Sequence, residues 1–127
     1  MALTQSSKEV ILKAKSFGFA VRITKLYKYI IKTKHENVLN KQLLRSGTAV
    51  GALIREAQNA ESKADFIHKL SIAQKECDES IYWLELLRET DFINKREFES
   101  IHKDANALLK MLRSAIITTK KLKDYNS

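Results

Sequence analysis

Apolar residues recur along most of this chain at spacings of three and four, the period that places them on one face of an α-helix. The pattern is interrupted at residues 35–37, 58–59 and 90–91. It therefore predicts four helices, at roughly residues 5–34, 38–59, 63–90 and 95–123. The apolar positions behind this prediction are, helix by helix, Leu12, Phe19, Ile23, Leu26 and Ile30; Leu39, Leu43, Leu44, Val50 and Ile54; Phe66, Leu70, Ala73, Cys77, Leu84 and Leu87; and Phe98, Ile101, Ala105, Leu108, Leu112, Ala115, Thr119 and Leu122.

Two helix starts and the scarcity of turn-forming residues indicate an all-helical fold. Ser62 is followed three residues later by Asp65, and Asn94 by Glu97, which is the spacing of a capping box at a helix N-terminus. The chain has no proline and three glycines, whereas strands depend on turns built from these residues. Because the joints are short, consecutive helices lie side by side. We predict an all-α, antiparallel up-and-down four-helix bundle, with residues 1–127 forming a single domain.

A stretch of small residues in the second helix points to close helix packing. Gly47 and Gly51 fall on the same face one turn apart. Each glycine costs a helix interior about 1 kcal/mol relative to alanine, so a close approach of two backbones is expected to offset that cost. A phosphate-binding loop is the weaker interpretation, because the stretch lacks the Gly-Lys-Ser/Thr ending and no strand precedes it.

Charge is distributed unevenly among the predicted helices. The chain holds 23 basic and 15 acidic residues, a net charge of +8, and the net charge is +6 for residues 1–36, +2 for 37–60, −4 for 61–92 and +4 for 93–127. The first and last helices are neighbours in an up-and-down bundle, so their basic stripes are expected to form one face that follows a phosphate backbone. Ordinary solvated helix faces are the alternative. The candidate nucleic-acid-binding residues are Lys15, Arg22, Lys25, Lys32, Arg96, Lys103, Lys110 and Arg113.

The acidic third helix carries a second apolar stripe outside its core positions. One bundle buries one stripe per helix, so a second stripe with aromatic residues indicates a partner surface. The alternative is that these residues cover the flank of their own bundle. An acidic, aromatic surface on one subunit and a basic surface on the next can join head to tail, so we expect self-association. The candidate interface residues are Ile72, Tyr82, Trp83 and Leu86.

Metal-dependent catalysis is disfavoured by the placement of the histidines. Bundle metal sites use a Glu-x-x-His on each of two helices, and the chain offers Asp65-x-x-His68 and Glu99-x-x-His102. These pairs open consecutive antiparallel helices, which puts them about 35 Å apart at 1.5 Å per residue. Cys77 lies on the core seam without a nearby histidine. We therefore predict no catalytic site, metal or cofactor.

Other features of the sequence suggest a cytoplasmic protein. The single cysteine excludes an internal disulfide and fits a reducing compartment. No apolar run approaches the roughly 18 residues that a membrane span needs, and the first 15 residues contain no stretch typical of a signal peptide. We therefore expect a cytoplasmic location and no membrane partner.

Several segments of the second and third helices resemble one family closely. They are residues 42–52, 55–57, 62–70, 73–76 and 82–87, with sequences QLLRSGTAVGA, REA, SKADFIHKL, AQKE and YWLELL. These segments are similar to the 23S ribosomal RNA intervening-sequence family of bacterial four-helix-bundle proteins. One departure is Leu53, where the resemblance leads us to expect Asn.

The resemblance implies an antiparallel four-helix bundle that assembles as a homopentameric ring and has no catalytic activity. It also implies distant kinship to the accessory proteins of diversity-generating retroelements, which are basic and bind nucleic acid. Together with the charge pattern, it favours a non-enzymatic oligomeric protein that binds RNA or DNA without sequence specificity. The alternative is an adaptor or scaffold whose basic face docks an acidic protein partner.

Overall fold

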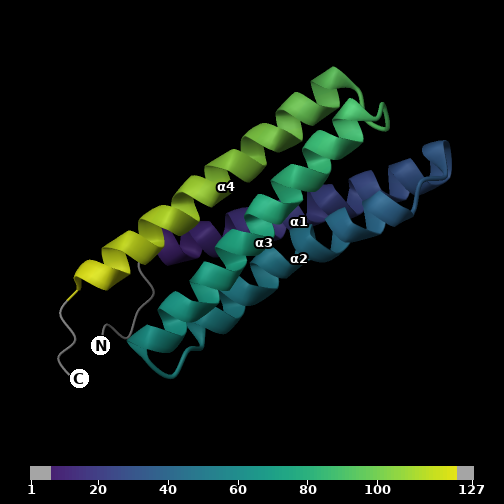
Figure 1. Cartoon of the computed structure of the whole chain (residues 1–127). Coiled ribbons are helices and arrows are strands. Elements are labelled where there is room, and N and C mark those ends of the chain that lie inside the picture. The colour runs from purple at the N-terminus through teal and green to yellow at the C-terminus, as the bar shows by residue number, and fades with distance from the viewer. Residues whose placement is uncertain (1–6, 123–127) are drawn as a thin grey trace.

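The computed structural model describes residues 7–122, which form an all-α bundle of four helices (Figure 1). The helices are α1 (Ser7–Lys34), α2 (Val38–Gln58), α3 (Lys63–Glu89) and α4 (Lys95–Lys121). The chain reverses direction at each joint, so successive helices run antiparallel. Each helix packs against two neighbours, and α1 packs against α4 as well as α2. The first and last helices are therefore adjacent, as predicted.

The observed helix ends lie close to the predicted ones. Helices α2, α3 and α4 begin at residues 38, 63 and 95, the predicted positions, and α1 ends at residue 34. Asn59 and Thr90 are C-cap residues rather than helical ones, so α2 and α3 each end one residue before the predicted end. The predicted start at residue 5 and the predicted end at residue 123 lie outside the described residues.

The N-cap bonds of the two predicted capping boxes are confirmed. Ser62 Oγ accepts a hydrogen bond from the Asp65 backbone N–H at 3.0 Å, and Asn94 Oδ1 accepts from the Glu97 N–H at 2.8 Å. These bonds satisfy backbone donors that the first turn of a helix leaves without partners.

Helix α2 is capped in another way. Asn37 occupies its N-cap position without a side-chain capping bond. Instead, the Glu36 carboxylate accepts hydrogen bonds from the N–H groups of Val38, Leu39 and Asn40, at 3.0, 3.1 and 2.9 Å. An acidic group at this end is also favoured by the helix dipole. The predicted break at residues 35–37 is thus the cap of α2.

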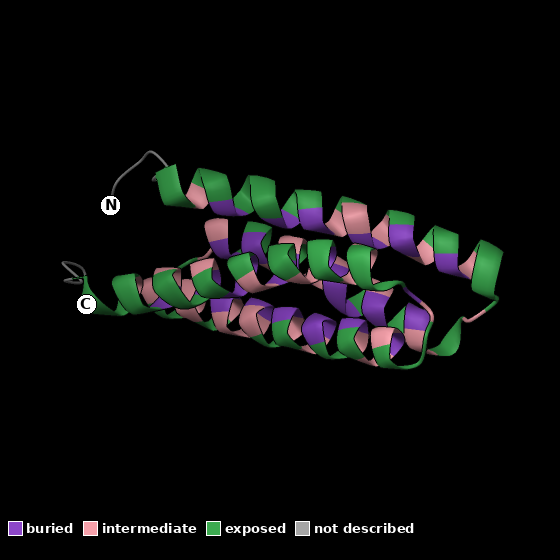
Figure 2. Cartoon of the chain, turned by 90° about the horizontal axis from the view of Figure 1, so that it is seen from above, coloured by how far each residue is buried: buried purple, intermediate pink, exposed green. Residues whose placement is uncertain are grey.

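The predicted seams form the core, as Figure 2 shows by the inward position of the buried residues. All five seam residues of α1 are buried, and so are those of α4 from Ile101 to Leu112. Phe66 and Phe98 are half-buried and pack against the core at opposite ends of the bundle. Leu122 was wrongly assigned to the α4 seam, because it follows the last helical turn and is 59% exposed.

The glycines of α2 permit the close helix packing that the sequence predicted. A Cβ atom built on Gly47 would lie 2.9 Å from both γ-carbons of Ile23 on α1, and one on Gly51 would lie 3.4 Å from the Ser16 carbonyl oxygen. On the α3 side, buried Ser46 and Ser80 join through a hydrogen bond of 2.9 Å between their hydroxyls. Small residues therefore bring α2 close to both of its neighbours.

No helix within residues 7–122 combines the length and apolarity needed to cross a membrane.

Candidate nucleic-acid interface

Arg22 joins the two basic helices. Its Nη1 lies 2.5 Å from Asp104 Oδ2 on α4, and its Nη2 donates a hydrogen bond of 3.0 Å to Ser100 Oγ. Both ionic side chains remain partly exposed, at 38% and 50%. This contact shows that the middle of α1 lies beside the first half of α4, and it gives the register between the two helices.

The register brings candidate residues of α1 and α4 to similar heights along the bundle. The helices are antiparallel, so each residue after Arg22 on α1 lies beside an earlier residue on α4. At 1.5 Å per residue, Lys15 lies at the level of Lys110, about 10 Å to one side of Arg22. Lys25 lies on the other side of Arg22, between the levels of Arg96 and Lys103. The basic residues of α1 and α4 therefore occupy overlapping levels along the bundle.

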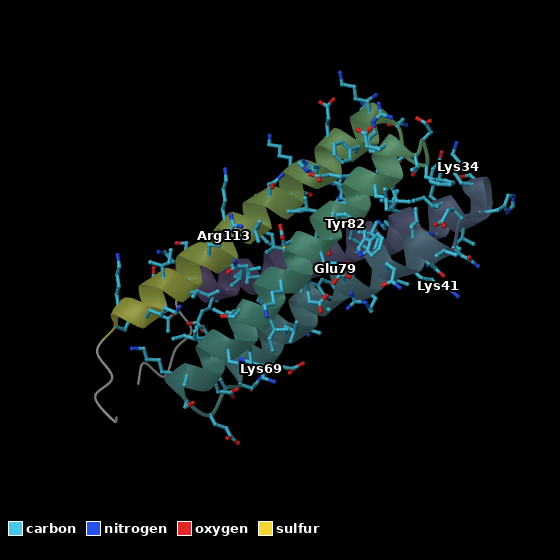
Figure 3. All side chains as sticks on the ribbon, in the orientation of Figure 1. Lys34, Lys41, Lys69, Glu79, Tyr82 and Arg113 are labelled. Atoms are coloured by element: carbon cyan, nitrogen blue, oxygen red, sulfur yellow. The ribbon has the colours of Figure 1, made fainter. Side chains whose placement is uncertain are left out.

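Positions around α4 divide its four candidates into two sets. At about 100° per residue, Arg96, Lys103 and Lys110 share an arc of roughly 40° on the outer side of the helix, roughly 80–120° around from Asp104. Arg113 lies about 180° around the helix from Asp104 by the same geometry, and its charge acts on Cys77 of α3. Arg113 therefore lies toward α3 rather than toward α1 (Figure 3).

Most candidates are free to meet an external phosphate. Arg22 is partly buried, and the other seven are exposed. Among the described residues, none of these seven has an ion pair or side-chain hydrogen bond. They are Lys15, Lys25, Lys32, Arg96, Lys103, Lys110 and Arg113. The candidate Arg22 differs from these seven, because it makes an ion pair with Asp104.

The candidate interface on α3 is built around an aromatic pair (Figure 3). Tyr82 is 56% exposed and makes an edge-to-face contact with Trp83, with 4.9 Å between ring centroids. Trp83 is half-buried against the core, and its Nε1 donates a hydrogen bond of 2.9 Å to Glu79. Ile72 and Leu86 are also half-buried. Tyr82 is thus the most exposed apolar group of this set.

Glu79 connects the aromatic pair to α2. Arg45 on α2 makes ion pairs with both Glu76 and Glu79. The hydrogen bond from Trp83 lowers the pKa of Glu79, and the Arg45 guanidinium lowers it further. The hydrogen bond to Glu79, and after it the bond to Glu76, raise the pKa of Arg45. The aromatic pair is therefore held by an ionised network.

His68 and His102, the histidines of the two Asp/Glu-x-x-His pairs, have separate surroundings. His68 is exposed near the start of α3. His102 Nε2 lies 3.0 Å from Glu85 on α3, and its Nδ1 lies 3.1 Å from the Asn106 amide. No group of three or more potential metal-binding side chains occurs within the described part of the chain.

Cys77 is a core residue. It is fully buried, and its Sγ donates to the Ala105 carbonyl at 3.4 Å. Burial raises the pKa of this thiol to about 12. A thiol in this state is a poor nucleophile, because the thiolate is the reactive form.

A cavity of about 270 Å³ lies where α1 ends and α4 begins. Its lining mixes two cationic and two anionic side chains with two aromatic rings, without cysteine or histidine. The lining residues are Tyr29, Lys34, Arg88, Asp91, Phe92, Ile93, Asn94 and Glu97.

Comparisons with known proteins agree with this architecture. The model of the family described as 23S rRNA-intervening sequence protein matches residues 8–114. The chain belongs to this family. A solved structure of a protein of unknown function from the S23 ribosomal protein family of Bacteroides thetaiotaomicron is 51% identical, with a TM-score of 0.85. The match covers 87% of this chain and 98% of that one. No curated protein matches the chain.

The family match covers α2 and α3 completely, most of α1 and α4, and every candidate residue named above. The segments in which the sequence resembles the family lie on α2, α3 and the joint between them. Leu53, which departs from the Asn expected in this family, is half-buried and packs against the core.

Sequence reasoning missed two features of these surfaces. One is Asp104, which neutralises part of the basic face; its place beside Lys103 in the sequence gave no sign of a contact with Arg22. The other is a row of exposed apolar residues on α1. The spacing of Val10, Ala14, Phe17 and Val21 would have identified that row.

Proposed function

We propose that this chain is a non-enzymatic, homo-oligomeric bundle protein that binds RNA or DNA without sequence specificity. The basic side chains of α1 and α4 contact the phosphate backbone, and the candidate residues are those given above except Arg113, which lies toward α3. The observation that carries the proposal is the contact between Arg22 and Asp104, because it places the two basic helices side by side. The family description refers to 23S rRNA, which makes RNA the first probe to test.

The charges favour phosphate contacts over base readout. Exposed lysines on convex helix surfaces reach phosphates without entering a groove in a fixed orientation, so they carry little sequence information. Affinity supplied by such contacts falls log-linearly with salt, with a slope of about −0.9 for each phosphate neutralised on duplex DNA. We therefore expect similar affinities for unrelated sequences of the same length and a steep salt dependence.

Fluorescence titration across a salt series tests this proposal. Single- and double-stranded RNA and DNA serve as probes. Lys103→Glu and Lys110→Glu are each expected to weaken binding and to flatten the salt slope. Lys41→Glu is the matched control, since Lys41 is also an exposed lysine without an ion pair but lies on α2 (Figure 3). Equal losses in all three variants would mean that net charge alone drives binding.

The titration at low salt also distinguishes nucleic acid from an acidic protein as the partner. If the pure protein binds neither RNA nor DNA at low salt, nucleic-acid binding is wrong. The same basic face would then be assigned to an acidic protein partner, which makes the protein an adaptor or scaffold.

Self-association is the other half of the proposal. The α3 residues Ile72, Tyr82, Trp83 and Leu86 form the candidate interface, and the resemblance described above implies five subunits. The Glu79 and Arg45 network supports this assignment, because it holds the aromatic pair in one orientation before any partner binds. Light scattering should give a single oligomeric mass, and a monomer at micromolar concentrations would contradict it.

A further inference from the structure

Helix α1 carries a second apolar face that points away from the core. Val10, Phe17 and Val21 are 52%, 57% and 36% exposed, and Ile11 beside them is 47% exposed. At about 100° per residue, Val10, Ala14, Phe17 and Val21 share an arc of roughly 60° on the side of the helix opposite Ile23. We name these five residues, Val10, Ile11, Ala14, Phe17 and Val21, the outer α1 stripe. Single exposed apolar residues are ordinary, but a continuous row marks an interaction surface.

The residues around the outer α1 stripe are basic, whereas those around Tyr82 on α3 are acidic. Lys28 continues the arc of the stripe and is exposed. On α3, Tyr82 is bordered by the exposed acids Asp78, Glu85 and Glu89. Residues 1–36 carry a net charge of +6 and residues 61–92 one of −4. The two surfaces are therefore alike in their apolar centres and opposite in charge.

The surfaces lie on opposite sides of the bundle. The Cα atoms of α1 and α3 do not come within 8 Å of one another in the described residues, because α2 and α4 separate these helices. Figure 1 shows α3 in front and α1 behind. One copy can thus use both surfaces at once, each toward a different neighbour.

We infer that the outer α1 stripe of one copy docks on the α3 surface of a second copy. This rests on the self-association proposed above and adds the surface that receives Tyr82. Pairing α3 with α3 would bring acids together, and pairing α1 with α1 would bring lysines together. The opposite charges favour the head-to-tail contact, which repeats from copy to copy and closes into a ring where the rotation allows.

Two variants with opposite defects test this contact. Phe17→Glu/Val21→Glu breaks the α1 stripe, and Asp78→Lys/Tyr82→Lys breaks the α3 surface. All four positions are exposed, and circular dichroism checks that both variants fold. Ala52→Glu, at an exposed position on α2, is the control and should keep the mass of the unmodified protein in sedimentation velocity.

Each variant alone is expected to be a monomer. An equimolar mixture should form a species larger than either variant alone, because the intact α3 surface of the first variant can receive the intact stripe of the second. If the α1 variant keeps the full oligomeric mass, or if the mixture stays monomeric, the docking is wrong while self-association stands. If the unmodified protein is itself monomeric, self-association and the docking both fail, and nucleic-acid binding remains to be judged by its own titration.

Discussion

The Arg22 guanidinium and the Asp104 carboxylate, 82 positions apart in sequence, are 2.5 Å apart in the bundle. They join α1 and α4, the neighbouring helices that no joint connects directly. Exposed ion pairs contribute only about 0–1 kcal/mol to stability. The main effect of this pair is electrostatic, since Asp104 neutralises a cation in the middle of the basic face.

Removing the Asp104 charge should strengthen nucleic-acid binding. Asp104→Asn frees Arg22 to meet a phosphate, so the affinity at low salt should rise and the salt slope should steepen by up to about 0.9. Unfolding in urea should show a loss of less than about 1 kcal/mol. Glu56→Gln is the control, because it makes the same change in net charge and frees Lys69 on α3 instead. An equal gain from both substitutions would argue against a localised basic face.

Replacing two of the glycines by alanine should change stability in opposite directions. Gly18 has no atom within 4 Å of an added Cβ, so Gly18→Ala should raise the free energy of unfolding by about 0.5–1 kcal/mol. Gly47→Ala gains the same helix propensity but forces a methyl group against Ile23, which is fully buried. Overpacking costs about 1–3 kcal/mol, so a net loss is expected. Chemical denaturation of the two variants measures the change in the free energy of unfolding, which should be a gain for Gly18→Ala and a loss for Gly47→Ala.

The Cys77 thiol should resist modification in the folded protein. With a pKa of about 12, about one thiol in ten thousand is ionised at pH 8. Burial also excludes a bulky reagent. A chromogenic disulfide reagent at pH 8 should therefore react only as the chain unfolds, with a rate that follows the unfolded fraction in urea. Rapid reaction of the native protein would show that α3 opens locally around this residue.

Acid titration should reveal the bond between Glu79 and Trp83. The folded-state pKa of Glu79 is lowered, first by the Trp83 hydrogen bond and then by Arg45. A lowered pKa stabilises the fold above the unfolded value of about 4.3, and this contribution is lost as the pH falls through the folded value. Trp83 is the single tryptophan, so its fluorescence should change with a midpoint below that of a free glutamate.

Two substitutions separate Glu79 from the other acids in this titration. Glu79→Gln should remove the fluorescence transition, whereas Glu85→Gln, which affects the contact with His102, should leave it in place. A transition that survives in Glu79→Gln would have to come from another group.

Much of the fold was readable from local patterns. The α1 seam from Leu12 to Ile30 and the caps at Ser62 and Asn94 were predicted because periodicity and capping depend on residues within one or two turns. The cap of α2 was missed, because Glu36 acts from a position that the usual N-cap preference does not include. The assignment of Leu122 to the α4 seam was wrong, because a heptad pattern does not show where the helix ends.

For the candidate sites too, some features followed from the sequence and others only from the tertiary structure. The sequence by itself determined the number of helices, most residues of the core and the sign of the charge on each helix, because these follow from side-chain chemistry at fixed helical spacing. Only the tertiary structure decided that Asp104 engages Arg22, that Arg113 lies toward α3, and that the outer α1 stripe and Tyr82 are on opposite sides. Those relationships depend on the rotation and register of packed helices, which are set by contacts such as that of Gly47 with Ile23 between residues far apart in the chain.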